Sequence, residues 1–166
     1  MKNNKIWLRK KLYDLGWYPL ARKHSKRVVI RIRGIILNDD KMLIVKMPHN
    51  NFYCLPGGKL DYGEDIKECL EREIIEELGI KPEIGRLLFS NTFIEKNKNQ
   101  SLEFIFEITN GKDYLNLDKV ERTHAHELED ICWIKRDGDI HILPNSIDKY
   151  FRDGEILSDV TRYIKD

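Results

Sequence analysis

The sequence predicts an α/β or α+β fold built in layers. Segments rich in β-branched residues flank one amphipathic helical segment in the middle of the chain, and two further helical segments close it. A helix with one apolar stripe must bury that stripe against a sheet or another helix. With 166 residues, of which 41% are hydrophobic, the chain has the size and composition of one globular domain.

The first half of the domain contains two strands, a turn and the central helix. Residues 28–37, VVIRIRGIIL, and residues 41–47, KMLIVKM, are rich in β-branched and aliphatic side chains. The NDD sequence between them predicts a turn, so the two strands are expected to form a hairpin. A glycine-rich acidic turn follows, and then a helix from about Asp65 to Leu78, which Gly79 ends.

The second half contains three strands and two terminal helices. Residues 84–94 and 101–108 have strand character and are separated by the polar turn EKNKNQ. Residues 130–136, DICWIKR, predict another strand. The apolar spacing in residues 144–151 and 156–164 predicts the two helices that close the chain.

Charge is distributed unevenly between the N-terminal segment and the rest of the chain. Residues 1–27 contain nine Lys and Arg residues and one acidic residue, a balance of +8. Residues 28–166 contain 20 basic and 27 acidic residues, a balance of −7. Leu8, Leu12 and Leu15 recur at helical spacing in the basic segment. We therefore expect a basic helical extension at 1–27 and the main domain at 28–166.

The basic extension suggests two roles. Its positive charge suits contact with the phosphates of a nucleic acid. Its apolar and aromatic residues, which include Ile6, Trp7 and Trp17, equally suit docking on the domain or on a second subunit. Docking on the domain or in a homodimer is favoured for this segment, and RNA binding is the less favoured alternative.

Neither a membrane location nor an oxidising compartment is expected. No apolar run approaches the roughly 18 residues that a spanning helix needs, and the N-terminus carries charges where a signal peptide has an apolar core. The three cysteines are far apart and form no CxxC pair, so a disulfide framework or a zinc site is not expected. These features favour a cytoplasmic protein with reduced cysteines.

The central helix concentrates negative charge beside its apolar stripe. The stripe recurs every four residues, at Ile66, Leu70, Ile74 and Leu78. Glu73, Glu76 and Glu77 stand three and four residues apart, so they share one face at the edge of the stripe. Carboxylates about 4–5 Å apart repel by several kcal/mol at an effective dielectric near 20. Arg72, which can pair with Glu68 and Glu76, offsets part of this repulsion.

A divalent cation would relieve the rest of the repulsion. Mg²⁺ and Mn²⁺ prefer oxygen ligands, and Mg²⁺ commonly shares phosphate oxygens with a substrate. The alternative is a solvated acidic face held by salt bridges. The preceding turn, PGGKLDYG, argues against that alternative, because its three glycines permit close backbone approach to a ligand and a helix start favours a phosphate.

The glycine-rich turn and the central helix together resemble the signature motif of the Nudix hydrolase superfamily. The positions that match its motif, the Nudix box, are Gly58, Glu64, Arg72-Glu73-Ile74, Glu76-Glu77 and Gly79-Ile80, with the family's spacing throughout. A chance match is on the order of one in a billion per start point. The resemblance covers about residues 28–136 well, 137–166 loosely and 1–27 hardly at all.

The resemblance implies a Nudix fold, with a mixed sheet between helices and a loop–helix–loop catalytic motif. It also implies Mg²⁺-dependent hydrolysis of a pyrophosphate bond in a nucleoside diphosphate linked to another group. The implied ligands of the ion are the carbonyl of Gly57 and the carboxylates of Glu73, Glu76 and Glu77. Arg72 would orient the catalytic glutamates, and Glu64 would help to shape the loop.

A further ligand or general base often comes, in this family, from a loop before the last core strand. Glu127, which lies six residues before Trp133, fits this position best. Glu129, Glu121 and a box glutamate are alternatives. The neighbouring His124 and His126 are left out of the metal site, since Mg²⁺ rarely takes imidazole.

The candidate substrate-binding residues lie in the turn and on the first strand. Gly58 and Lys59 belong to the glycine-rich turn. Arg31 and Arg33 alternate on the strand, where they would hold a phosphate in a bidentate manner or lie on a solvated face.

The substrate itself is predicted only as a class. No proline stands near Glu95, where many ADP-ribose hydrolases carry one, and the coenzyme A and NADH signatures of the family are absent. A nucleotide sugar or an ADP-ribose-like compound is slightly favoured over a nucleoside triphosphate. The alternatives are an RNA-directed Nudix enzyme that uses residues 1–27 and a catalytically silent module that senses a nucleotide.

Overall fold

The computed structural model describes residues 27–48, 51–95, 99–120 and 128–166. Of the predicted helical extension at 1–27, all but Arg27 lies outside the described residues, so its helix and its two suggested roles stay predictions.

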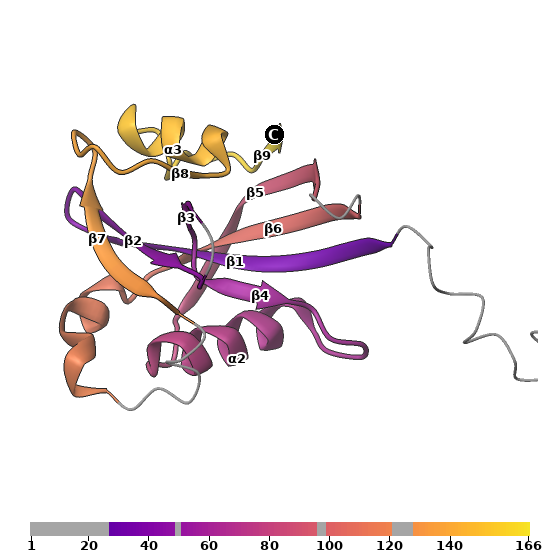
Figure 1. The fold of residues 1–166 in the computed structure, drawn as a ribbon, viewed down its shortest axis with the longest axis horizontal. Coiled ribbons are helices and arrows are strands. Elements are labelled where there is room, and N and C mark those ends of the chain that lie inside the picture. The colour runs from indigo at the N-terminus through magenta and orange to yellow at the C-terminus, as the bar shows by residue number, and fades with distance from the viewer. Residues whose placement is uncertain (1–26, 49–50, 96–98, 121–127) are drawn as a thin grey trace, which may run out of the picture.

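The described residues form one mixed, curled sheet with helices on both sides (Figure 1). The strands run in the order β8-β3-β2-β1-β6-β5-β9, with β4 paired to β1 and β7 paired to β2. Their bounds are β1 (Val28–Asn38), β2 (Lys41–Lys46), β3 (Tyr53–Cys54), β4 (Gly57–Lys59), β5 (Ile84–Ile94), β6 (Gln100–Ile108), β7 (Asp130–Lys135), β8 (Ile142–Leu143) and β9 (Arg162–Lys165).

Strand β1 organises the sheet because it pairs with three other strands. It runs parallel to β6 from Val28 to Ile36. On its other side it pairs with β4 through Arg31 to Arg33, and with β2 only at its far end, through Leu37 and Asn38. The split between β4 and β2 curls the sheet and brings the glycine-rich turn beside the middle of β1.

Helix α2 (Ile66–Leu78) begins and ends at residues that the sequence marks for these roles. The carboxylate of Asp65 accepts the backbone N–H of Lys67 at 2.8 Å, and Glu68 accepts that of Asp65 at 3.2 Å, which forms a capping box. Gly79 ends the helix in the left-handed conformation, at φ 76°.

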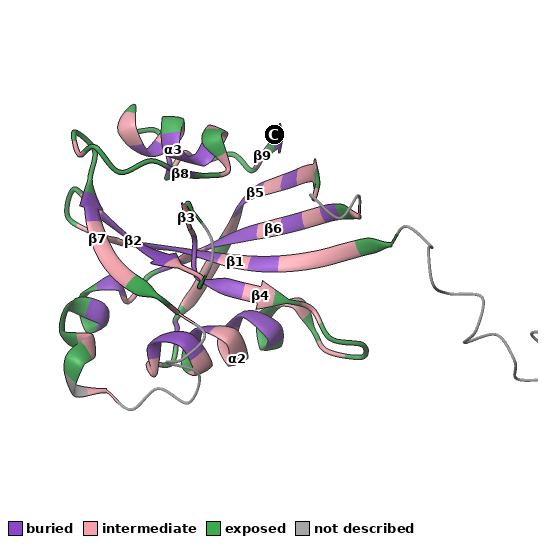
Figure 2. Ribbon diagram, in the orientation of Figure 1, coloured by how far each residue is buried: buried purple, intermediate pink, exposed green. Residues whose placement is uncertain are grey.

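The two helices cover opposite faces of the sheet (Figures 1 and 2). Helix α2 buries its predicted apolar stripe against one face, where the cluster includes Ile32, Ile36, Leu70, Ile74 and Leu78. Helix α3 (Asn145–Arg152) packs on the other face, where the cluster includes Ile35, Phe89, Ile105, Ile147 and Phe151. The 3-10 helix η2 (Gly111–Lys119) adds the fully buried Tyr114 to the side of α2.

Most of the predicted elements are confirmed with small shifts at their ends. These are the strands at 28–37, 41–47, 84–94, 101–108 and 130–136 and the helices at 65–78 and 144–151. The predicted layered α+β fold, with a mixed sheet between helices, is likewise confirmed. The short strands β3, β4 and β8 and the helix η2 were not predicted.

The predicted helix over residues 156–164 is wrong. Residues from Arg162 onward form β9, which pairs in parallel with the edge of β5. Val160 and Ile164 do stand at helical spacing, but the hydroxyl of Ser158 bonds the backbone of Val160 at 3.2 and 3.4 Å. Such local bonds compete with helical ones, and the open edge of β5 offers backbone hydrogen bonds to the aromatic and β-branched residues that follow.

None of the helices in the described ranges combines the length and the apolarity that are needed to cross a membrane.

The first testable prediction concerns the C-terminal strand. Ile164 is 7% exposed and belongs to the core cluster beneath α3, whereas the next residue, Lys165, is exposed. We expect Ile164→Ala to lower the free energy of unfolding by about 2 kcal/mol or more. Lys165→Ala should change it by less than about 0.5 kcal/mol. Urea unfolding measures both values, and equally small losses would contradict the pairing of β9.

Candidate active site

The site is built around two consecutive glycines on β4. Gly57 lies opposite Arg33, and Gly58 lies opposite Ile32, in the antiparallel pairing with β1. A Cβ on Gly57 would overlap the carbonyl oxygen of Ile32, and the φ of 118° at Gly57 also disfavours any other residue. A Cβ on Gly58 would overlap the carboxylate of Glu73. The position of Gly57 therefore requires glycine, whereas a side chain at Gly58 would displace the carboxylate of Glu73.

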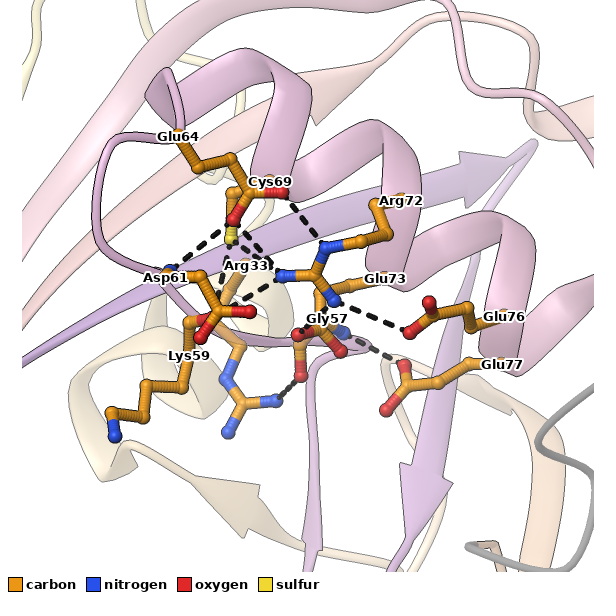
Figure 3. A network of polar contacts seen from close by, with 10 residues as sticks. All are labelled: Arg33, Gly57, Lys59, Asp61, Glu64, Cys69, Arg72, Glu73, Glu76 and Glu77. Atoms are coloured by element: carbon orange, nitrogen blue, oxygen red, sulfur yellow. Dashed lines mark hydrogen bonds and ion pairs between the residues drawn. The ribbon is translucent and has the colours of Figure 1, made fainter.

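The three clustered glutamates of α2 point toward this turn (Figure 3). Glu77 is only 5% exposed, and its carboxylate accepts the backbone N–H of Gly57 at 2.8 Å. Glu73 lies directly over Gly58. The side chains of Glu73 and Glu76 are 18% and 26% exposed. As the helical spacing predicts, the carboxylates lie at the border of the core and not in bulk water.

Arg72 holds the acidic groups together (Figure 3). Its Nη1 donates to Glu73 at 2.9 Å and to Glu76 at 3.2 Å, and its Nε and Nη2 donate to Glu64 at 2.8 and 3.0 Å. The hydrogen bonds to Glu64 are the main reason that the pKa of Arg72 is raised. The expected pairing of Arg72 with Glu68 is absent, because Glu68 takes part in the capping box of α2.

Glu64 fastens the loop before α2 to the helix. Its Oε2 accepts the backbone N–H of Asp61 at 3.2 Å and the bond from Arg72 Nη2, while its Oε1 accepts the bond from Arg72 Nε. The side-chain hydrogen bond from Arg72 lowers the pKa of Glu64 from 4.5 to about 2. This carboxylate is therefore fully ionised at neutral pH and serves as the anchor for the arginine.

The donor set suits a hard divalent cation. It consists of oxygens alone, from Glu73, Glu76, Glu77 and the Gly57 carbonyl, and two of the carboxylates already reach the turn. Across the described ranges, no three carboxylate, imidazole or thiol groups converge closely enough to hold one ion. The reason is that Arg72 draws Glu73 and Glu76 to itself, while the amide of Gly57 draws Glu77. Side-chain rotations are thus needed before an ion is held.

The two candidate arginines of β1 are tied to other parts of the protein. The Nη1 of Arg33 donates to the carbonyls of Leu55, at 3.1 Å, and Gly57, and its Nε lies 3.6 Å from Glu103 Oε1. Arg31 donates to Glu95 Oε1 from Nη2 at 2.8 Å and from Nε at 3.2 Å. Arg33 is therefore a partner of the turn itself, a role that the sequence did not suggest.

Lys59 contributes its backbone carbonyl to the polar contacts of this region. Its carbonyl accepts from Arg72 Nη2 at 3.4 Å, and its position lies opposite Arg31 across the strands. Two basic side chains therefore stand on neighbouring strands beside the box.

The loop that was expected to supply a general base is described only in part. Glu129 is described, and its carboxylate lies 2.6 Å from Lys46 Nζ. Four other residues of the loop lie outside the described residues: Glu121, His124, His126 and Glu127. The assignment of Glu127 as the general base stays a prediction.

Two buried polar residues on the sheet face that α3 covers were not predicted from the sequence. Glu103 and Asn91 are 4% and 0% exposed, and Asn91 Nδ2 donates to Glu103 Oε2 at 3.0 Å. A signal was available in SLEFIFEI, where Ser101 and Glu103 alternate with apolar residues and share a face with the buried Ile105. A charged residue on the core-facing period of a central strand indicates a specific partner.

The comparison with known protein families and sequences agrees with this geometry. The model of the NUDIX domain matches residues 28–145. An ADP-ribose pyrophosphatase of Methanocaldococcus jannaschii is 33% identical over 89 residues, which cover 50% of this chain and 53% of that protein. The chain therefore spans about half the length of this relative.

Solved structures share the fold. A MutT NUDIX hydrolase from Burkholderia pseudomallei superposes with a TM-score of 0.61 at 21% identity, over 77% of this chain and 98% of the other. An ADP-ribose pyrophosphatase from Streptococcus suis gives a TM-score of 0.58 at 16% identity, over 82% and 98% of the two chains. Because the family model covers most of the described domain and the box is complete, the chain belongs to the NUDIX domain family.

Proposed function

We propose that this protein hydrolyses a pyrophosphate bond in a nucleoside diphosphate derivative, with Mg²⁺ or Mn²⁺ as its cofactor. The observation that carries the proposal is the meeting of Glu73 and Glu77 at the Gly57–Gly58 turn, with Glu76 held beside them by Arg72. The products would be a nucleoside monophosphate and a second phosphorylated compound.

Some box residues would bind the ion, and others orient the residues that bind it. Glu73, Glu76, Glu77 and the Gly57 carbonyl would hold the ion, which neutralises charge on pyrophosphate oxygens and activates water when it is bound. Arg72 keeps Glu73 and Glu76 side by side, and it is itself fixed by Glu64. This arrangement keeps the carboxylates clustered beside the turn before a substrate arrives, so that only side-chain rotations separate them from a geometry that holds an ion.

The general base is proposed to be Glu127, with a box glutamate as the alternative. Glu129 is the weaker candidate, because its carboxylate is paired with Lys46.

For the substrate we favour an ADP-ribose-like compound or a nucleotide sugar over a nucleoside triphosphate. The relative from Methanocaldococcus jannaschii that is 33% identical is named an ADP-ribose pyrophosphatase, which supports this class. Arg31 and Lys59 are opposite each other on β1 and β4 beside the box. Two basic residues on paired strands beside the box suit the phosphates of such a compound.

The second prediction is that turnover requires a divalent cation. Phosphate-ester products should form from ADP-ribose, nucleotide sugars or nucleoside triphosphates with millimolar Mg²⁺ or Mn²⁺, disappear with excess EDTA, and return when the ion is restored. Undiminished turnover in EDTA would contradict the proposed mechanism. Tight nucleotide binding without any turnover across the panel would instead support a sensing module.

The third prediction separates the glutamates of α2 by their roles. Glu76→Gln keeps the size of the side chain but removes a charge next to Arg72, so kcat should fall by about 100-fold or more while the fold persists. Glu71 provides the matched control, since it lies on the same helix and pairs with the exposed Lys81 at 2.8 Å. Glu71→Gln should keep near-normal turnover. Equal activities of the two variants would show that the acidic face of α2 is only a solvated surface with no role in turnover.

The fourth prediction is a pH dependence of stability that comes from Glu64. Because the pKa of Glu64 falls from 4.5 to about 2 on folding, its pair with Arg72 stabilises the folded state above about pH 4.5. That contribution is lost as the pH falls toward about 2, where the folded form becomes protonated. Glu64→Gln should therefore reduce the free energy of unfolding most at neutral pH.

Chemical denaturation of the wild type and Glu64→Gln across this range measures the gap between their stabilities. The gap should narrow steadily below about pH 4.5. A gap that stays constant with pH would show that Glu64 acts through packing and not through its charge.

A further inference from the structure

Charged side chains form hydrogen bonds with both the N–H and the carbonyl of Gly57 (Figure 3). Its N–H donates to the buried carboxylate of Glu77 at 2.8 Å. Its carbonyl oxygen accepts a hydrogen bond from Arg33 Nη1, which also donates to the carbonyl of Leu55 at 3.1 Å. One of the four proposed ligands of the ion is therefore occupied by a guanidinium group.

This guanidinium is well shielded from water. The side chain of Arg33 is 14% exposed and that of its neighbour Glu103 is 5% exposed. Charges in such surroundings interact more strongly than at the surface, because less water screens them. A divalent cation on the same carbonyl would meet a like charge within a few ångströms. The carbonyl has two lone pairs, so geometry permits both partners, but their charges oppose each other.

We propose that Arg33 is a positioning residue that competes with the divalent cation for the Gly57 carbonyl and turns toward Glu103 when the ion binds. This inference rests on the proposed function, because it takes the Gly57 carbonyl as a ligand. It assigns Arg33 to the ion site, whereas the sequence suggested a contact with substrate phosphate.

Glu103 is suited to receive the arginine. Arg33 Nε lies 3.6 Å from Glu103 Oε1, which is an ion pair that falls short of a good hydrogen bond. The other oxygen, Oε2, is held by Asn91 Nδ2 at 3.0 Å, so the carboxylate is fixed in orientation. A small movement of the guanidinium away from Gly57 would shorten the pair with Glu103. A closer ion pair with the carboxylate of Glu103 would thus replace the hydrogen bond that Arg33 makes to the Gly57 carbonyl.

The test measures binding of Mn²⁺ alone to the metal-free protein, without substrate, by the electron paramagnetic resonance signal of the free ion. Arg33→Gln retains an N–H donor for the carbonyl but removes the competing charge. We expect its Kd for Mn²⁺ to fall by about tenfold relative to the wild type. Arg86→Gln is the matched control, because it likewise removes an arginine charge whose Nε lies 3.6 Å from a glutamate of β6, Glu107. Its Kd should stay within about twofold.

Glu103→Gln supplies an independent arm of the experiment. Without this carboxylate, Arg33 has no anionic partner to turn toward when the ion binds. Mn²⁺ should therefore bind more weakly to Glu103→Gln than to the wild type. In the Arg33→Gln background the same substitution should have little effect, and this non-additivity is the signature of competition. If Arg33→Gln fails to fold, as judged by circular dichroism, the weakening in Glu103→Gln carries the test.

The outcomes are distinguishable from failure of the proposed function. Weaker Mn²⁺ binding to Arg33→Gln would show that Arg33 supports the carbonyl for the ion, and unchanged binding would show that it does not face the ion, so either result overturns the inference. Glu76→Gln reports on the function itself. If the wild type binds Mn²⁺ and Glu76→Gln does not, the proposed ion site stands whatever Arg33 does. If the wild type binds no Mn²⁺, the proposed function fails together with the inference.

Discussion

The structure depends on the close approach of a two-glycine turn to a strand on one side and a helix on the other. Gly57 lies against the carbonyl of Ile32, and Gly58 lies beneath the carboxylate of Glu73. A side chain at Gly57 would push β4 away from β1, and one at Gly58 would displace the carboxylate of Glu73 from the turn. The pairing of β4 with β1 and the place of the Glu73 carboxylate therefore depend on these contacts.

Crowding of carboxylates at this turn is balanced by two arginines that approach it from opposite sides. Arg72 comes from α2 and pairs with Glu64, Glu73 and Glu76. Arg33 comes from β1 and holds the turn by its carbonyls. A half-buried acidic cluster without such partners would be destabilised by the repulsion between its carboxylates. The arginines offset that repulsion and hold the carboxylates and the turn together when no ion is bound.

What the sequence predicts well is local, and what it misses arises from contacts between distant segments. The apolar stripe of α2 and the shared face of Glu73, Glu76 and Glu77 follow from helical spacing, and the end of the helix follows from Gly79. The contact of Arg33 with Gly57 joins positions on two strands whose pairing no periodicity reveals. Strands of two or three residues, such as β3 and β4, are too short to show alternation. At the C-terminus, an open sheet edge overrode a helical pattern.

The surroundings of the box carbonyl are set by residues that the box does not contain. From Gly57 the polar contacts run to Arg33 on β1, then to Glu103 on β6 and Asn91 on β5. Each of these side chains is largely buried, so none can change its partner without a response from the next. Two chains with identical boxes can therefore differ at the Gly57 carbonyl. Residues on strands outside the motif decide whether a guanidinium group already bonds to that carbonyl.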